Sequence, residues 1–120
     1  MKQYTPQEIV DTVIPLMVEQ GCPSVDEEGN CEYRGPNGVK CAAGFFLTDR
    51  EAKDPAAVYY HPDFKEQGEE TLAVLASVQT YAHDANSLKG EGFIPAFLST
   101  MKAICEEHNL KFPEEYAQWK

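Results

Sequence analysis

The residue types that could carry chemistry in this chain are its four cysteines and three histidines. Cys41 follows Lys40 where a short helix is expected to begin, and both a neighbouring cation and a helix N-terminus favour a reactive thiolate. His61 or His83 could then act as the base, with Asp84 orienting it, in the usual nucleophile–base arrangement. Since no cysteine-protease signature surrounds Cys41, the competing interpretation is a buried cysteine of the core.

A metal site would have to draw on Cys31, Cys41, Cys105 and His108. Cys105 and His108 are three residues apart and share one face of an expected helix. Zinc ligands usually come in close pairs such as Cys-x-x-Cys, whereas Cys22, Cys31 and Cys41 are nine and ten residues apart. We therefore expect no metal and no other cofactor, and those four residues are the candidates if the fold gathers them.

The dipeptide His83-Asp84 is a second candidate for catalysis. Metal-dependent phosphohydrolases use such a pair together with further histidines, and only His61 and His108 remain here to complete a set. The local alternative is that Asp84 accepts hydrogen bonds in the following loop and that His83 lies favourably at a helix C-terminus. Cys41, His83 and Asp84 are thus the candidate catalytic residues, no reaction is assigned, and a non-enzymatic role is favoured.

A possible anion site lies between Arg34 and Lys40, on either side of the turn 35–38. Glycine-rich turns present backbone amides to phosphates. The turn lacks the spacing and the following hydroxyl of a P-loop, so nucleotide hydrolysis is not implied. Binding of a small anionic ligand, such as a nucleotide signal, remains an alternative to an exposed turn with solvated basic side chains.

Charge and length limit the possible functions. The 120 residues suit one domain, 1–120, with 20 acidic and 10 basic residues and a net charge of −10 shared evenly by the two halves. This balance argues against direct nucleic-acid binding, which needs a basic face, and would steer a basic protein partner to the surface. The sequence has no export signal and no apolar run of membrane length, so we expect a cytoplasmic protein with reduced cysteines and no membrane contact.

The fold class expected is α+β, mainly α: a single small domain of about three to four helices with one β-hairpin. Thr5, Pro6 and Glu8 form a helix-start signature, and Gly21 ends that helix. Strand-like runs on either side of the turn 35–38 predict the hairpin over 31–41. Tyr81 is expected to widen the apolar stripe of a later helix. The expected helices cover 6–20, 41–47, 65 or 69 to about 85, and 93–108.

Two motifs resemble a signature of small proteins encoded in phage and prophage genomes. The first is Cys31-x-Tyr33-Arg34-x-x-x-Gly38-x-Lys40-Cys41-Ala42-x-Gly44, and the second is Gln79-x-x-x-His83-Asp84. The resemblance covers about residues 6–110, with a departure at Phe45-Phe46, where that pattern has a smaller residue followed by an aliphatic one. The family has no established activity. Membership implies an accessory protein that acts on host machinery.

The hypothesis favoured is a protein of the bacterial host cytoplasm that binds a host protein, for example a basic one from nucleic-acid-handling or defence machinery, and inhibits or redirects it. A metal- or cysteine-dependent hydrolase and a binder of a small anionic ligand are the alternatives. The expected contact residues are aromatic and polar, as is usual for such surfaces: Tyr33, Arg34, Asn37, Lys40, Tyr59, Tyr60 and His61.

Overall fold

The computed structural model describes residues 3–25, 32, 34–35, 38–47 and 67–116. Three α-helices lie within these ranges, together with five shorter helical turns. The α-helices are α1 (Pro6–Gln20), α2 (Glu69–Ser77) and α3 (Phe93–Glu107). The shorter turns are η2 (Ala43–Phe46), η5 (Val78–His83), η6 (Asp84–Asn86), η7 (Gly90–Gly92) and η8 (Glu114–Tyr116).

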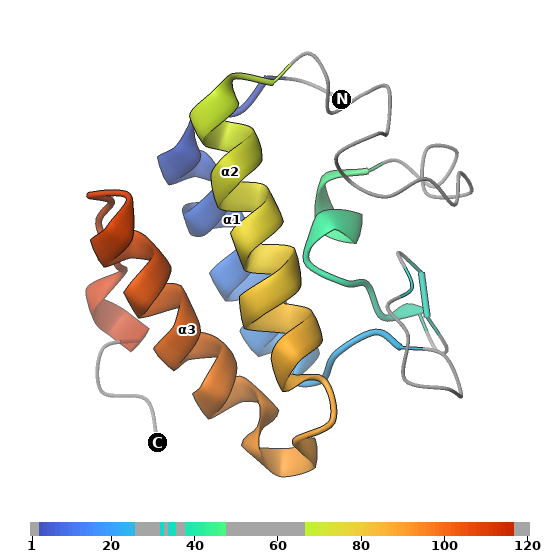
Figure 1. Ribbon diagram of the computed structural model, residues 1–120. Coiled ribbons are helices and arrows are strands. Elements are labelled where there is room, and N and C mark those ends of the chain that lie inside the picture. The colour runs from blue at the N-terminus through green and yellow to red at the C-terminus, as the bar shows by residue number, and fades with distance from the viewer. Residues whose placement is uncertain (1–2, 26–31, 33, 36–37, 48–66, 117–120) are drawn as a thin grey trace.

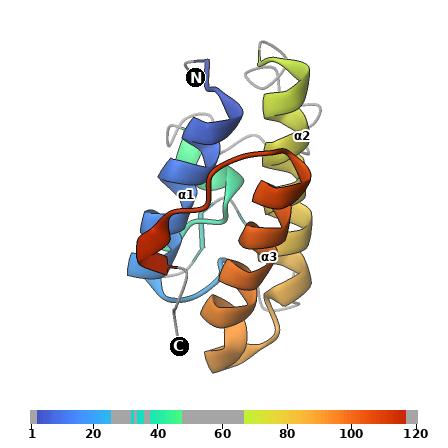
Figure 2. The same cartoon turned by 90° about the vertical axis from the view of Figure 1, so that its left-hand side faces the viewer.

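The three helices form a small bundle in which α2, η5 and η6 make one continuous helical column. α3 returns beside this column and packs against η5, and α1 packs against both α2 and α3 (Figure 1). Figure 2 shows α1 on one side of the molecule, α2 and α3 on the other, and the chain after α3 crossing back towards α1. Residues 38–47 lie on the side of the column away from α3.

The start and the end of α1 confirm the sequence prediction. The Thr5 hydroxyl accepts from the Glu8 amide and the Glu8 carboxylate accepts from the Thr5 amide, so both partners of the capping box are present. The helix continues through Pro15 and ends at Gly21, whose φ of 80° is left-handed. Its apolar face supplies the core with Ile9, Val10, Val13, Ile14 and Met17.

The long helix predicted up to residue 85 is continuous, but its hydrogen bonding changes along its length. α2 ends at Ser77, and the six residues of η5 are π-helical before η6 tightens to a 3₁₀ turn. A π turn bonds residue i to i+5 and so holds more residues than an α turn. Within this wider turn, Val78, Ala82 and His83 are all buried on the same side of the helix. Tyr81, expected to extend the apolar stripe, is 61% exposed, and that prediction was wrong.

The prediction for α3 is confirmed over its whole length. Phe93, Phe97, Met101 and Ile104 are buried on one face. At the C-terminus the Leu110 amide donates to the Cys105 carbonyl over 2.7 Å, and φ at Asn109 is 56°. This is a left-handed C-terminal cap followed by an apolar residue.

The predicted β-hairpin over 31–41 was wrong, and with it the α+β class: no strand occurs in the part of the chain that the structure describes. Gly35 and Val39 share one hydrogen bond, of 2.8 Å, from the Gly35 amide to the Val39 carbonyl. Instead of pairing across the turn, the Lys40 amide and carbonyl both bond to the side chain of Gln20. Helix side chains thus take the backbone groups that a ladder would have used. The turn's central residues, 36–37, lie outside the described residues.

The short buried helix predicted over 41–47 is present as η2. Ala42, Ala43 and Gly44 are fully or almost fully buried at its start, and the ring of Phe46 meets Tyr4 edge to face at 5.0 Å between centroids. Residues 41–47 therefore contribute to the core, although they form no long element. None of the helices described is long and apolar enough to cross a lipid bilayer.

Candidate functional site

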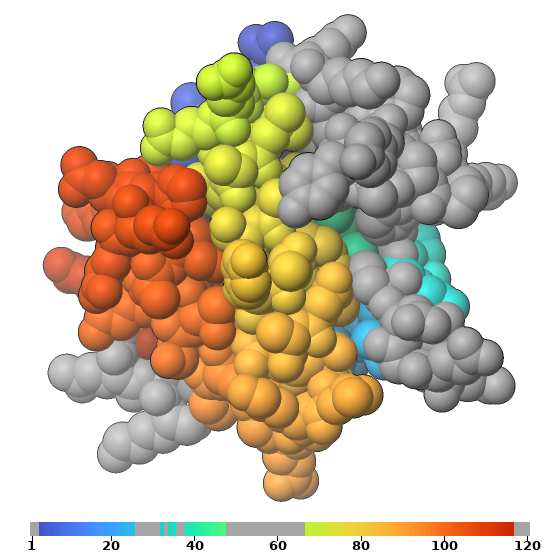
Figure 3. All heavy atoms as spheres, in the orientation of Figure 1, coloured from blue at the N-terminus to red at the C-terminus, as the bar shows by residue number. Residues whose placement is uncertain are grey.

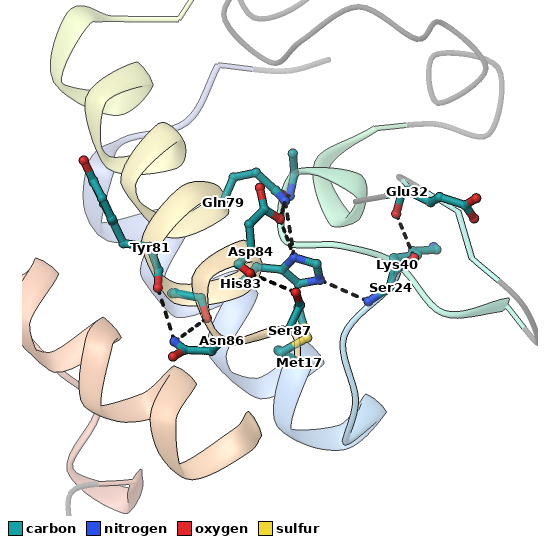
Figure 4. Close-up of polar contacts among 12 residues, drawn as sticks. Met17, Ser24, Glu32, Lys40, Gln79, Tyr81, His83, Asp84, Asn86 and Ser87 are labelled. Atoms are coloured by element: carbon teal, nitrogen blue, oxygen red, sulfur yellow. Dashed lines mark hydrogen bonds and ion pairs between the residues drawn. The ribbon is translucent and has the colours of Figure 1, made fainter. Parts of the chain in front are cut away.

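His83 lies at the centre of a buried polar cluster that joins the two sequence motifs (Figure 4). Its ring is fully buried on η5 and makes an edge-to-face contact with the ring of Phe93 from α3, with 5.8 Å between the ring centroids. The Ser24 amide donates to Nε2 over 3.0 Å, and Nδ1 lies 2.8 Å from Oδ1 of Asp84. An amide donor requires a bare Nε2, so the ring is neutral and carries its proton on Nδ1, which donates to Asp84.

Gln79 stands one helical turn before His83 and makes the second link. Its Oε1 accepts from the Ala43 amide over 2.8 Å, and its Nε2 donates to Asp84 over 2.7 Å. Ala43 begins η2 within the first motif, so the side-chain carbonyl of Gln79 caps that turn. Nε2 of Gln79 is also 3.4 Å from Nδ1 of His83. Because both nitrogens carry protons, this is a packing contact between two donors that share Asp84.

Ser24 holds the loop after α1 on this cluster. Besides the amide bond to His83, its hydroxyl donates to the Glu32 carbonyl over 2.7 Å, and the Glu32 amide donates back to the Ser24 carbonyl over 3.2 Å. Ser24 is fully buried. Residues 24 and 32 are therefore fastened side by side, and His83 connects both to the helices.

Arg34 performs an internal role within the first motif. Its two terminal guanidinium nitrogens donate to the carbonyls of Gly44 and Leu47, each over 2.7 Å. Gly44 lies within η2, where its carbonyl also accepts from the Leu47 amide over 3.3 Å, and Leu47 follows the last residue of this turn. The arginine that was expected to meet a partner or an anion thus fastens residue 34 to η2.

Glutamine amides repeat this function at both ends of α1. Gln20 pairs with the amide and carbonyl of Lys40 at 2.7 and 2.8 Å. Gln7 pairs in the same way with the amide and carbonyl of Lys111, at 2.8 Å each. Each side chain imitates a neighbouring peptide group, because an amide offers one acceptor and donors in the same plane.

The cluster contains the histidine and the carboxylate of a catalytic dyad, but the Nε2 atom of the histidine is not free to accept a proton from a substrate. Asp84 orients His83 as the carboxylate does in a Ser-His-Asp triad. A general base must reach the proton that it removes, and Nε2 of His83 is already bonded to the Ser24 amide. Among the described residues, every buried side-chain nitrogen and oxygen has a hydrogen-bond partner. The arrangement is a closed structural network.

The cysteines and His108 do not assemble a metal site within the described ranges. Cys41 is fully buried, and the two ring nitrogens of His83 are bonded to the Ser24 amide and to Asp84. Burial, then the charges of Asp11 and Glu106, raise the pKa of Cys105 to about 11. No group of three or more metal-ligating side chains occurs among the residues described, so Cys41, Cys105 and His108 do not converge. Cys31 lies outside those residues.

Five of the seven expected contact residues also fall outside the described residues: Tyr33, Asn37, Tyr59, Tyr60 and His61. Arg34 and Lys40 are both half-buried. Among the residues that the sequence analysis missed are Ser24 and Gln20, which link the end of α1 and its following loop to His83 and to Lys40. Neither stands in a motif, and only their spatial partners reveal their role.

No family model matches the chain, and no curated protein or solved structure matches it either. The polar cluster is therefore interpreted from its own geometry.

Proposed function

We propose that the protein works by binding another protein, as a phage-type accessory factor that inhibits or redirects a component of its bacterial host. One observation carries the proposal: among the described residues, polar side chains from both motifs bond inside the fold. Arg34 bonds to η2, Gln79 to Ala43 and Asp84, and His83 to Ser24 and Asp84. Such a network maintains a defined shape, and a defined shape is what a binding module needs.

The hydrolase alternative receives less support from the same contacts. A working base would need His83 to give up the Ser24 amide, and a nucleophile would need Cys41 to leave the core. Both changes break buried packing or hydrogen bonds and so oppose the folded state. The anion-binding alternative loses its main cation, because the Arg34 guanidinium already serves two carbonyls.

The chemistry of the partner follows from the charge and from the exposed apolar side chains. α1 carries Glu8, Asp11 and Glu19 and has no lysine or arginine, and the chain as a whole has a net charge of −10. A basic partner would be attracted to such a surface. Tyr81 is 61% and Leu88 is 84% exposed, the largest exposed fractions among the large apolar side chains of the described residues.

Tyr81 and Leu88 are the proposed anchors on the described surface. The Tyr81 ring points away from the polar cluster in Figure 4, and α2, η5 and α3 form one continuous face in Figure 3. Aromatic anchors beside acidic residues suit a basic protein with an apolar patch. The expected contacts at Tyr33, Asn37, Lys40, Tyr59, Tyr60 and His61 remain part of the proposal.

The test is affinity capture from host extract with matched surface variants. We expect the unmodified protein to retain one partner in stoichiometric amount, and a Tyr81→Ala/Leu88→Ser double variant to retain about tenfold less, since anchor residues contribute at least ~1.4 kcal/mol. Leu16→Ser is the control, because Leu16 is an exposed apolar residue on α1. Recovery of no stoichiometric partner, with a nucleotide raising the melting temperature instead, would contradict the proposal and favour ligand binding.

A further inference from the structure

The π turn η5 brings Tyr81 to the surface of the bundle. Such a turn holds about one residue more than an α turn, because it bonds residue i to i+5. The residues at its start, 78–79, and at its end, 82–83, are buried, whereas Thr80 and Tyr81 between them are exposed. At α-helical spacing Tyr81 would lie beside the buried stripe of α2. The wider turn instead directs this large side chain outward, where 61% of it is exposed.

The backbone of Tyr81 is held from inside the molecule by Asn86, which is buried. Nδ2 of Asn86 donates to the Tyr81 carbonyl over 3.2 Å and to the Ala82 carbonyl over 2.9 Å. It also donates to Oγ1 of Thr100 on α3 over 3.2 Å, and that hydroxyl donates to the Ala96 carbonyl. The end of the π turn is thus fastened both to itself and to α3. A residue whose backbone is fixed in advance loses less conformational entropy when it binds.

The side chain of Tyr81 has no task inside the fold. With the other described residues it makes no hydrogen bond, ion pair or ring contact, and its ring points away from the polar cluster (Figure 4). The helical column 69–86 contains no lysine or arginine, so it offers the ring no cation of its own. Glu69, Glu70 and Asp84 are exposed along the same column. These charges attract cations from outside, and the face of an aromatic ring binds them.

We propose that the π turn presents Tyr81 as a docking site for the guanidinium of an arginine on the partner protein. This inference rests on the proposed function and names the chemistry that one of its anchors recognises. A tyrosine ring attracts a cation that lies within about 6 Å of its centroid, and arginine is the usual cation there because its planar group stacks on the ring. The net charge of −10 draws a basic segment to the protein, and Tyr81 gives that segment a fixed point of contact.

The probe is a short synthetic peptide of alternating arginine and glycine, titrated into the unmodified protein and followed by NMR at physiological salt. We expect the ring signals of Tyr81 to shift and to saturate, because a guanidinium bound on the ring changes the environment of its protons. A peptide with glutamate in place of arginine should leave these signals unchanged. Ring signals that do not respond to the arginine peptide would overturn the proposal.

Two substitutions at Tyr81 separate a cation site from a plain apolar contact. Tyr81→Leu keeps a large apolar side chain and the net charge but removes the aromatic face, so the Kd for the arginine peptide should rise about fivefold or more. Tyr81→Phe keeps the face, so the Kd should change by less than about twofold. An unchanged Kd for Tyr81→Leu, or an equal loss in both variants, would contradict a guanidinium on the ring.

The role given to the π turn is tested by two deletions of equal length. Removal of either Thr80 or Tyr81 leaves the number of residues that an α turn needs, with the buried residues before and after it on the same side. We expect both variants to melt within about 5 °C of the unmodified protein. Deletion of Thr80 should preserve peptide binding, and deletion of Tyr81 should weaken it as Tyr81→Leu does. Unfolding of both deletion variants would show that the additional residue serves the fold, and would overturn the role of the π turn.

The inference and the proposed function fail in different ways. A captured host protein that binds Tyr81→Leu as tightly as the unmodified protein would overturn this inference and leave the proposed function standing. Capture of no host protein would overturn the proposed function, while the peptide titration would still establish what the Tyr81 ring binds.

Discussion

A glutamine side chain carries the same donor–acceptor pair as a peptide group, and this protein uses that equivalence repeatedly. Gln7, Gln20 and Gln79 each complete the hydrogen bonding of backbone that belongs to no regular element. Buried backbone groups must find partners, because an unpaired one costs about 1–3 kcal/mol. The irregular segment is therefore stabilised by side chains of the helices more than by its own pairing.

Gln79→Leu tests this role at a single residue. The leucine fills a similar volume but leaves the Ala43 amide unpaired and removes the amide donor that Gln79 presents to the Asp84 carboxylate, so the free energy of unfolding should fall by about 1–3 kcal/mol in urea denaturation. Thr80→Val is the control, since Thr80 is the exposed neighbour and should change stability by no more than about 0.5 kcal/mol. Equal effects of the two changes would contradict the role given to Gln79.

The thiols should differ strongly in reactivity. Cys22 is exposed and Cys105 is almost fully buried, with its pKa raised to about 11 from about 9. Two pKa units reduce the reactive thiolate about 100-fold, so an alkylating reagent near neutral pH should modify Cys22 long before Cys105. Site assignment by mass spectrometry after short labelling times checks the order. Equal labelling rates would show that Cys105 is accessible and less perturbed than its surroundings indicate.

The same thiol gives stability a dependence on alkaline pH with a defined sign. The unfolded chain releases the Cys105 proton near pH 9, while the folded protein keeps it until about pH 11. The folded state binds more protons in this window, so its stability is complete below pH 9 and decreases as the pH rises towards 11. Urea denaturation across this range should show a shallower decrease for Cys105→Ala than for the unmodified protein. An identical decrease of the unfolding free energy with pH in both proteins would show that Cys105 does not cause this pH dependence.

Elements were predictable from the sequence where local rules act alone. The capping box of α1, Gly21 and the left-handed Asn109 follow from residue types at fixed spacings, and the structure has all three. Whether the hairpin formed depended on contacts between residues that are distant in the sequence. Turn residues and β-formers predicted pairing across 35–38, but Gln20, which is close in space and distant in sequence, competes for Lys40. Only the fold reveals such a competitor.

The candidate site shows the same limit. The motif Gln79-x-x-x-His83-Asp84, quoted for the resemblance, contains three residues that the structure places in one hydrogen-bonded cluster. The sequence left open whether His83 and Asp84 are catalytic or structural, because the group that occupies Nε2 of His83 is a backbone amide. Ser24 contributes that amide, and an amide leaves no signature in a sequence.

Gly35→Ala examines the packing of residue 35 against the loop after α1. A methyl group there would lie 2.5 Å from Oγ of Ser24 and 2.8 Å from Cγ2 of Val39, closer than atoms can approach. We expect a loss of about 1–3 kcal/mol in unfolding free energy, as for other overpacked sites. Gly92→Ala is the matched control: its φ is negative, its nearest atom is 3.8 Å away, and its stability should be unchanged or slightly higher. A tolerated Gly35→Ala would mean that residues 24 and 35 are not in contact.

The molecule as a whole is an acidic helical bundle with one irregular flank. Its charge of −10 predicts that association with a basic partner is fast at low salt and slows as salt is added, while dissociation changes little. Surface plasmon resonance on the captured partner, at two ionic strengths, measures both rates. An association rate that does not change with ionic strength would contradict electrostatic steering and would leave the apolar contacts at Tyr81 and Leu88 as the cause of binding.

The ring nitrogens of His83 offer the decisive observation, because the structural role of both motifs depends on their protonation. Long-range ¹H–¹⁵N NMR at neutral pH should show a neutral ring with Nδ1 protonated and Nε2 bare, and a hydrogen-bond coupling or proximity between Nε2 and the Ser24 amide. A ring protonated on Nε2, or one that exchanges between tautomers as an exposed histidine does, would contradict a closed network. It would return His83 and Asp84 to the residues available for chemistry.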